Sequence, residues 1–244
     1  MADRVVPGRR AGVAARRKRL AAMGGAMVLL VATVVVATYT PLFGVDEIRV
    51  EGVATLSADE VVALAGVGEG TNVVHLDTGA VEDALEQDPW IMRATVTRDL
   101  PTTIVVHVVE RSPVVAAGSE VLAEDATVLP GAGTRRLPVL EAVAGELGPD
   151  DLRAGAAAAG AMAPPVRGRV ASILVEADED LVLLLDDGVT VFYGAPGEDA
   201  EKAEALGALL AWAQGEGVGL ASADISVPAA PTARPLGGAS TAVP

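Results

Sequence analysis

The chain has 244 residues, with 33 acidic against 18 basic side chains and a net charge of −15. It contains no cysteine and two histidines, so the sequence predicts neither a thiol nucleophile nor a metal site built from Cys or His. The negative charge argues against nucleic acid as a partner, because phosphate binding requires a basic surface.

A long uncharged run, residues 20–45, follows a basic N-terminal segment. Seven of the 18 basic residues lie in the first 19 positions, whereas the residues after position 19 have a net charge of −21. Because a helix rises about 1.5 Å per residue, residues 20–42 are long enough to cross a membrane. Positive flanks stay cytoplasmic, which predicts a cytoplasmic tail over 1–19 and an extracytoplasmic remainder. The length of the run disfavours the alternative, a cleaved signal peptide.

The first block after the run, residues 43–113, combines short strands with two short helices. Ser57 and Glu60 form a capping box, Gly66 can end the helix that follows, and Pro89 stops a second helix. Both helices can cover one face of a small sheet, which is an α+β arrangement. The predicted elements are a strand at 45–50, helices at 57–65 and 77–88, and strands at 92–96 and 102–110.

The second block, residues 114–228, predicts a larger mixed sheet with helices. Gly188 marks a turn between two strands, and Leu206, Leu209 and Leu210 form the apolar stripe of a helix. A Pro/Ala/Gly-rich tail, 229–244, is predicted to be disordered. The predicted elements are a hairpin at 121–129, helices at 150–162 and 199–214, and strands at 170–176, 181–185, 189–193 and 224–227.

The first block resembles a POTRA domain, a small β-α-α-β-β module. Phe43–Val45 match its opening, Asp88–Ile91 its later half and Glu110–Pro113 its exit. The chain as a whole resembles the FtsQ (DivIB) family of bacterial division proteins. That resemblance rests on the order of an anchor, the POTRA-like block, Phe192-Tyr193-Gly194 and Asp224-x-Ser226-x-Pro228.

The resemblance implies a non-catalytic, single-pass scaffold of the divisome at the division septum, located in the cytoplasmic membrane. It implies FtsB (DivIC) and FtsL as partners, with no cofactor, metal, nucleic acid or small-molecule substrate. A terminal strand often lies at a sheet edge and can pair with a partner's strand, and the family binds FtsB there. The predicted partner-binding residues are Tyr193, Asp224, Ile225, Ser226, Val227 and Pro228.

Two alternatives remain open from the residues. Another POTRA-bearing assembly or secretion component would be expected to precede a barrel, and the chain has too few alternating ten-residue strands for one. An anchored extracytoplasmic enzyme or sensor would be expected to have a convergent pocket with perturbed titratable groups. No catalytic residue is predicted, because neither histidine has a recognisable serine or aspartate partner and no Gly-x-Ser-x-Gly motif occurs.

Overall fold

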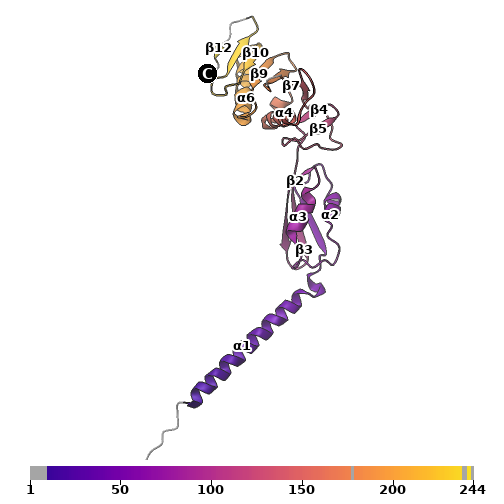
Figure 1. The fold of residues 1–244 in the computed structure, drawn as a ribbon, viewed down its shortest axis with the longest axis vertical. Coiled ribbons are helices and arrows are strands. Elements are labelled where there is room, and N and C mark those ends of the chain that lie inside the picture. The colour runs from indigo at the N-terminus through magenta and orange to yellow at the C-terminus, as the bar shows by residue number, and fades with distance from the viewer. Residues whose placement is uncertain (1–9, 177–178, 238–240, 243–244) are drawn as a thin grey trace, which may run out of the picture. The chain divides into compact units, whose positions relative to one another are not determined.

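The computed structural model describes residues 10–176, 179–237 and 241–242 (Figure 1). The chain divides into two compact units. The first comprises the chain up to Glu86 together with Arg93–Val108, and the second comprises Gln87–Met92 together with Val109 onward. The predicted class, α+β with an N-terminal apolar helix, a small first domain and a larger mixed sheet, is confirmed. Residues 1–9 of the predicted tail lie outside the described residues.

The first unit begins with α1 (Arg10–Thr38), whose Arg19–Thr38 segment is long and apolar enough to cross a membrane. The helix ends at Thr38 rather than at the predicted residue 42. Pro41 has no amide hydrogen, and the residue before it, Thr40, is extended, so the helix cannot continue. A 3₁₀ turn, η1 (Pro41–Phe43), follows.

The predicted order of strand, helix, helix, strand, strand is confirmed in the first unit. β3 lies between β1 and β2, and β1 runs parallel to β3. The buried side chains of the unit come from both helices, from β2 and β3, from Val45 just before β1, and from Val73 between the helices. The elements are β1 (Glu47–Glu51), α2 (Ala58–Ala65), α3 (Thr78–Glu86), β2 (Ile91–Asp99) and β3 (Thr103–Glu110).

Helix α2 has the capping box that the sequence predicts. The Ser57 hydroxyl accepts a hydrogen bond from the Glu60 amide at 3.2 Å, and the Glu60 carboxylate accepts one from the Ser57 amide at 2.8 Å. This bond from the Ser57 amide lowers the pKa of Glu60 below its ordinary value. Gly66 ends the helix with φ of 62°, a left-handed conformation that glycine adopts without strain.

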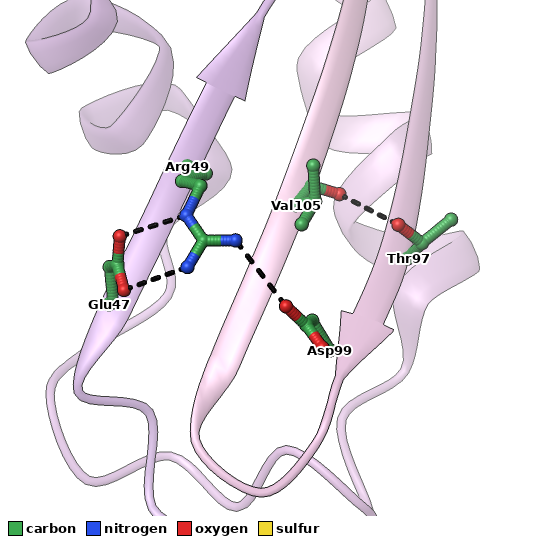
Figure 2. Close-up of polar contacts among 5 residues, drawn as sticks. All are labelled: Glu47, Arg49, Thr97, Asp99 and Val105. Atoms are coloured by element: carbon green, nitrogen blue, oxygen red, sulfur yellow. Dashed lines mark hydrogen bonds and ion pairs between the residues drawn. The ribbon is translucent and has the colours of Figure 1, made fainter.

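The exposed face of this sheet carries an ion-pair network (Figure 2). Arg49 on β1 donates to both carboxylate oxygens of Glu47, at 3.0 and 3.2 Å, and to Asp99 on β2 at 3.3 Å. Because Val105 of β3 pairs with Arg49 in the sheet, the guanidinium reaches across the middle strand. The hydrogen bond to Glu47 raises the pKa of Arg49, and at this exposed site the network contributes little to stability.

The second unit is a mixed sheet with the order β12-β11-β10-β9-β8-β7-β6-β4-β5. β6 and β7 are parallel and joined by α4 and α5, and β9 and β10 are parallel and joined by α6, as parallel neighbours require. The strands are β4 (Val115–Ala117), β5 (Glu120–Leu122), β6 (Val139–Ala142), β7 (Val170–Val175), β8 (Leu181–Leu185), β9 (Thr190–Gly194), β10 (Leu220–Asp224), β11 (Thr232–Pro235) and β12 (Thr241–Ala242). The helices are α4 (Pro149–Ala161), α5 (Pro164–Arg167) and α6 (Asp199–Glu216).

The two faces of this sheet differ in what covers them. Side chains from α4 and α6 pack into one continuous core with one face. A row of paired residues on that face is buried across six strands: Leu140, Ile173, Leu183, Val191, Ala223 and Ala233. The adjacent row points to the opposite face and is largely exposed at its ends: Glu141, Leu174, Val182, Phe192, Asp224 and Thr232.

Two predictions about the C-terminal part of the sheet are wrong. The strand predicted at 224–227 is β10, and it ends at Asp224 instead of beginning there. The tail predicted to be disordered contains β11, which pairs with β10. Pro231 and Pro235 suggested a tail without structure, but they lie immediately before and at the end of β11, where a proline is tolerated. Residues 238–240 and 243–244 of this tail lie outside the described residues.

Candidate partner-binding surface

The six predicted partner-binding residues lie close together in the second unit. Tyr193 is in β9, Asp224 ends β10, and residues 225–228 begin the connection from β10 to β11. Asp224 pairs with Phe192, the neighbour of Tyr193, in the parallel ladder of β9 and β10. The Ile225 amide extends this pairing by donating to the Phe192 carbonyl at 2.9 Å.

The strand before this connection is not at the edge of the sheet, which corrects the prediction. β10 pairs with β9 on one side and with β11 on the other. In the described part of the sheet, the edge strand at this end is the short strand β12. It pairs with β11 at Thr232 and Ala233. The prediction missed β11 because the three prolines of residues 228–235 look like a break in secondary structure.

Tyr193 is completely buried, at 0% exposure, so it is not itself a contact surface. Its hydroxyl donates to an Asp199 carboxylate oxygen at 2.7 Å, and the Lys202 ammonium lies 4.9 Å from the centre of its ring. Lys202 is also buried and donates to the Ala195 carbonyl. Burial, together with the Asp199 carboxylate, raises the pKa of Tyr193 far above its ordinary value, so the phenol stays neutral. The tyrosine therefore fixes the start of α6 against β9.

The connection after β10 is held by a small polar turn. One Asp224 carboxylate oxygen accepts from the Ser226 amide at 3.0 Å and from the Ser226 hydroxyl at 2.7 Å. Gly194 adopts φ of 78°, and a Cβ there would come within 2.7 Å of the Ser226 Cβ. Glycine is required at this position both for its backbone conformation and for the close approach of Ser226. Ile225 is buried beside this turn and, like Tyr193, is unavailable for direct contact.

The exposed part of this region keeps four of the six predicted residues and adds Phe192, Thr232 and Arg234, which were not chosen. Phe192 is 47% exposed and Val227 is 59% exposed. Phe192 also lines a shallow hollow of about 130 Å³ with side chains from β10 and β11. We define the C-terminal surface as the exposed or half-buried residues Phe192, Asp224, Ser226, Val227, Pro228, Thr232 and Arg234.

The sequence predicted that one aromatic of the pair Phe192 and Tyr193 would be buried, but Tyr193 was chosen as the contact. Alternation along a strand separates the two side chains onto opposite faces, yet it does not say which face the helices cover. The core position of Tyr193 depends on Asp199 and Lys202, which follow β9 at the start of α6. Asp199, six residues after Tyr193, was the signal in the sequence that favoured burial of Tyr193, because a buried tyrosine needs a polar partner for its hydroxyl.

Comparisons with known proteins identify the family. The model of the FtsQ-type POTRA domain matches residues 43–111. The chain is 30% identical over 203 residues to the cell division protein FtsQ of Corynebacterium glutamicum, covering 80% of this chain and 91% of that protein. The chain belongs to the FtsQ cell division protein family.

Other FtsQ proteins are longer than the matched region. The chain is 31% identical over 180 residues to FtsQ of Mycobacteroides abscessus, covering 70% of this chain and 57% of that protein. It is 32% identical over 190 residues to FtsQ of Mycolicibacterium smegmatis, covering 75% of this chain and 56% of that protein. The chain thus spans little more than half the length of these two FtsQ relatives.

Among solved structures, the extracytoplasmic domain of the division protein DivIB from Geobacillus stearothermophilus covers 43% of this chain and 92% of its own. The sequence identity is 17% and the TM-score is 0.32, values at which the similarity carries no conclusion of its own. Membership of the FtsQ family, which the other comparisons establish, favours a division protein over the two alternatives that the residues had left open.

Proposed function

We propose that this FtsQ-family chain is a non-catalytic, single-pass membrane scaffold of the bacterial divisome. It would bind FtsB (DivIC) and FtsL during septum formation, with its N-terminus in the cytoplasm and the residues that follow α1 outside. Family membership and the candidate transmembrane helix support this proposal. The basic residues at the N-terminal end of α1, among them Arg16 and Arg19, support the orientation, because positive flanks are retained in the cytoplasm.

The observation that carries the partner proposal is the edge of the sheet beside the C-terminal surface. β11 pairs with β10 along its inner side, and among the described residues its outer side pairs with β12 at Thr232 and Ala233. The described pairing of β12 comprises two residue pairs, which hold a strand weakly, so a longer strand from a partner could replace β12 and add to β11. Phe192 and Val227 expose apolar side chains near this edge and would contact the partner's side chains. The proposal therefore moves the docking strand from β10 to β11.

Site-specific crosslinking tests strand addition directly. The chain has no cysteine, so Arg234→Cys on β11 introduces a single reactive thiol in the full-length protein. We expect disulfides with cysteines placed along the C-terminal part of FtsB to form at every second position, because strand side chains alternate with a period of two. Glu120→Cys, on the edge strand at the opposite end of the sheet, is the matched control and should form none.

Crosslinks from both edges, or a helical spacing of three to four residues along FtsB, would contradict strand addition at β11.

A second test addresses the side chains. Phe192→Asp combined with Val227→Asp should weaken FtsB binding to full-length protein in detergent by about tenfold or more, because desolvated apolar contacts dominate interface energies. Val143→Asp, at an exposed valine after β6, controls for added charge and should bind like the wild type.

A further inference from the structure

The join between the anchor helix and the first unit is held by side chains from two distant segments. The Asn72 amide donates to the carbonyl of Thr38, the last residue of α1, at 2.6 Å. The Thr38 hydroxyl lies 3.2 Å from the His75 ring nitrogen Nε2. The Tyr39 ring stacks on the His75 ring with centroids 4.1 Å apart and planes 20° from parallel. We call these four residues the anchor clasp.

Backbone hydrogen bonds extend the clasp into the first unit. The Val73 amide donates to the Phe43 carbonyl at 2.7 Å, and the Val45 amide donates to the Thr71 carbonyl at 2.8 Å. The Asn72 side chain is itself oriented, because its oxygen accepts from the Val74 amide at 3.0 Å. Because residues 43–45 pair with residues 71–73 on both sides of Asn72, the join is an ordered part of the unit rather than a free linker.

Exposed apolar side chains lie where the membrane span ends. The Arg19–Thr38 segment has 20 residues. At about 1.5 Å per residue it is about 30 Å long, the thickness of a hydrocarbon core, so Thr38 lies at the core boundary. Tyr39 is 68% exposed and Leu42, in η1, is 73% exposed. The first charged residue after the span is Asp46.

We propose that Tyr39 and Leu42 lie in the lipid headgroup region of the bilayer that α1 spans, and that the anchor clasp thereby holds the first unit at the membrane surface. The bilayer is the expected occupant of this surface because the two side chains continue directly from the span. A tyrosine suits this depth, since its ring is apolar and its hydroxyl can reach water. This inference rests on the membrane span proposed for α1, but it needs no protein partner.

Depth measurements on the full-length protein in phosphatidylcholine–phosphatidylglycerol vesicles test the lipid contact. A nitroxide attached at Leu42→Cys should be more accessible to oxygen and less accessible to a water-soluble nickel chelate than one at Leu64→Cys, which is on the surface of α2. A label at Val31→Cys, in the middle of the span, marks the deep limit. Water accessibility at Leu42 equal to that at Leu64 would overturn the lipid contact.

Hydrogen exchange tests the clasp independently. Asn72→Ala combined with His75→Ala should speed exchange of the Val45 and Val73 amides about tenfold or more, because the hydrogen bonds of both side chains and the ring stack are lost. His107→Ala, which removes the other histidine from the exposed face of β3, is the matched control and should leave these two amides unchanged. Exchange in β3 reports whether the unit remains folded.

Unchanged exchange at Val45 and Val73 in the double variant, with β3 still protected, would overturn the clasp. None of these measurements uses FtsB. A failure of the scaffold proposal would appear in the crosslinking experiment and would leave the depth and exchange results unaffected, so the two proposals fail separately.

Discussion

The two units of this protein place their polar groups differently. In the first unit, the ion pairs of Arg49 with Glu47 and Asp99 lie on an exposed sheet face. In the second unit, the hydroxyl of Tyr193 and the ammonium of Lys202 are bonded inside the protein. Exposed pairs contribute little to stability, whereas a buried polar group that loses its partner is costly. Tyr193 and Lys202 are therefore polar side chains that form part of the packing of the second unit.

The units also differ in how far apart their paired residues lie along the chain. The helices of the first unit are bounded by local signals such as Ser57, Gly66 and Pro89. The second unit joins β6 to β7 and β9 to β10 through helical crossovers, so its sheet depends on pairing between distant segments. This contrast predicts that substitutions at local helix signals lower the stability of the first unit. It also predicts that contacts around β9 determine whether the C-terminal surface keeps its structure.

The largest expected effects test whether the two units are stable independently. Leu85 in the first unit and Leu206 in the second are completely buried, so Leu85→Ala and Leu206→Ala should each lower the free energy of unfolding of their own unit by about 2–5 kcal/mol. Hydrogen exchange on the full chain would measure β1 to β3 separately from β7 to β10. Equal acceleration in both units by either substitution would show that they unfold together.

A smaller effect is expected at the approach of β9 to the turn after β10. Gly194→Ala should destabilise the second unit by about 1–3 kcal/mol, because alanine is strained at φ of 78° and its Cβ meets Ser226. Gly188→Ala is the control, since Gly188 has φ of 85° but open space around its Cβ. Chemical unfolding followed by Trp212 fluorescence would compare them. An equal loss in both variants would mean that the contact with Ser226 adds nothing to the backbone strain.

The buried tyrosine should give the second unit a dependence on alkaline pH. The pKa of Tyr193 is raised above its ordinary value of 10.0 by burial first and by Asp199 second. Its stabilisation is therefore complete below about pH 10 and is lost as the pH rises through the folded-state value. Tyr193→Phe should cost about 1–2 kcal/mol at pH 8 and flatten the decline above pH 10, measured by urea unfolding. If the stability of Tyr193→Phe falls above pH 10 as steeply as that of the wild type, groups other than Tyr193 cause the fall.

The smallest expected effect lies at the cap of α2. Ser57→Ala should lower the stability of the first unit by about 1 kcal/mol, and Ser57→Asp, which keeps an accepting oxygen, should lower it less. Because the Ser57 amide lowers the pKa of Glu60, the contribution of Glu60 is present at neutral pH and is lost as the pH falls through its folded-state value. Exchange of the α2 amides would measure both effects. Equal exchange in the alanine variant and the wild type would remove the capping box as a source of stability.

Much of the architecture follows from short stretches of sequence. The capping box, the stop before Pro89, the Gly188 turn and strand 181–185 are all present as predicted. The resemblance to the FtsQ family, drawn from motifs spread between residues 20 and 228, is confirmed by the comparisons. The partner role of the C-terminal surface stays a prediction.

The sequence by itself determined the apolar span, the order of elements in the first unit and the central strands β7, β8 and β9 of the second, because these depend on neighbouring residues. Only the tertiary structure decided that β10 lies inside the sheet, that β11 forms within a proline-rich tail and that Phe192 rather than Tyr193 is exposed. The physical reason is that a strand's neighbours and its covered face depend on pairing with distant segments. In this chain α6 covers the Tyr193 face of β9 and leaves Phe192 on the other.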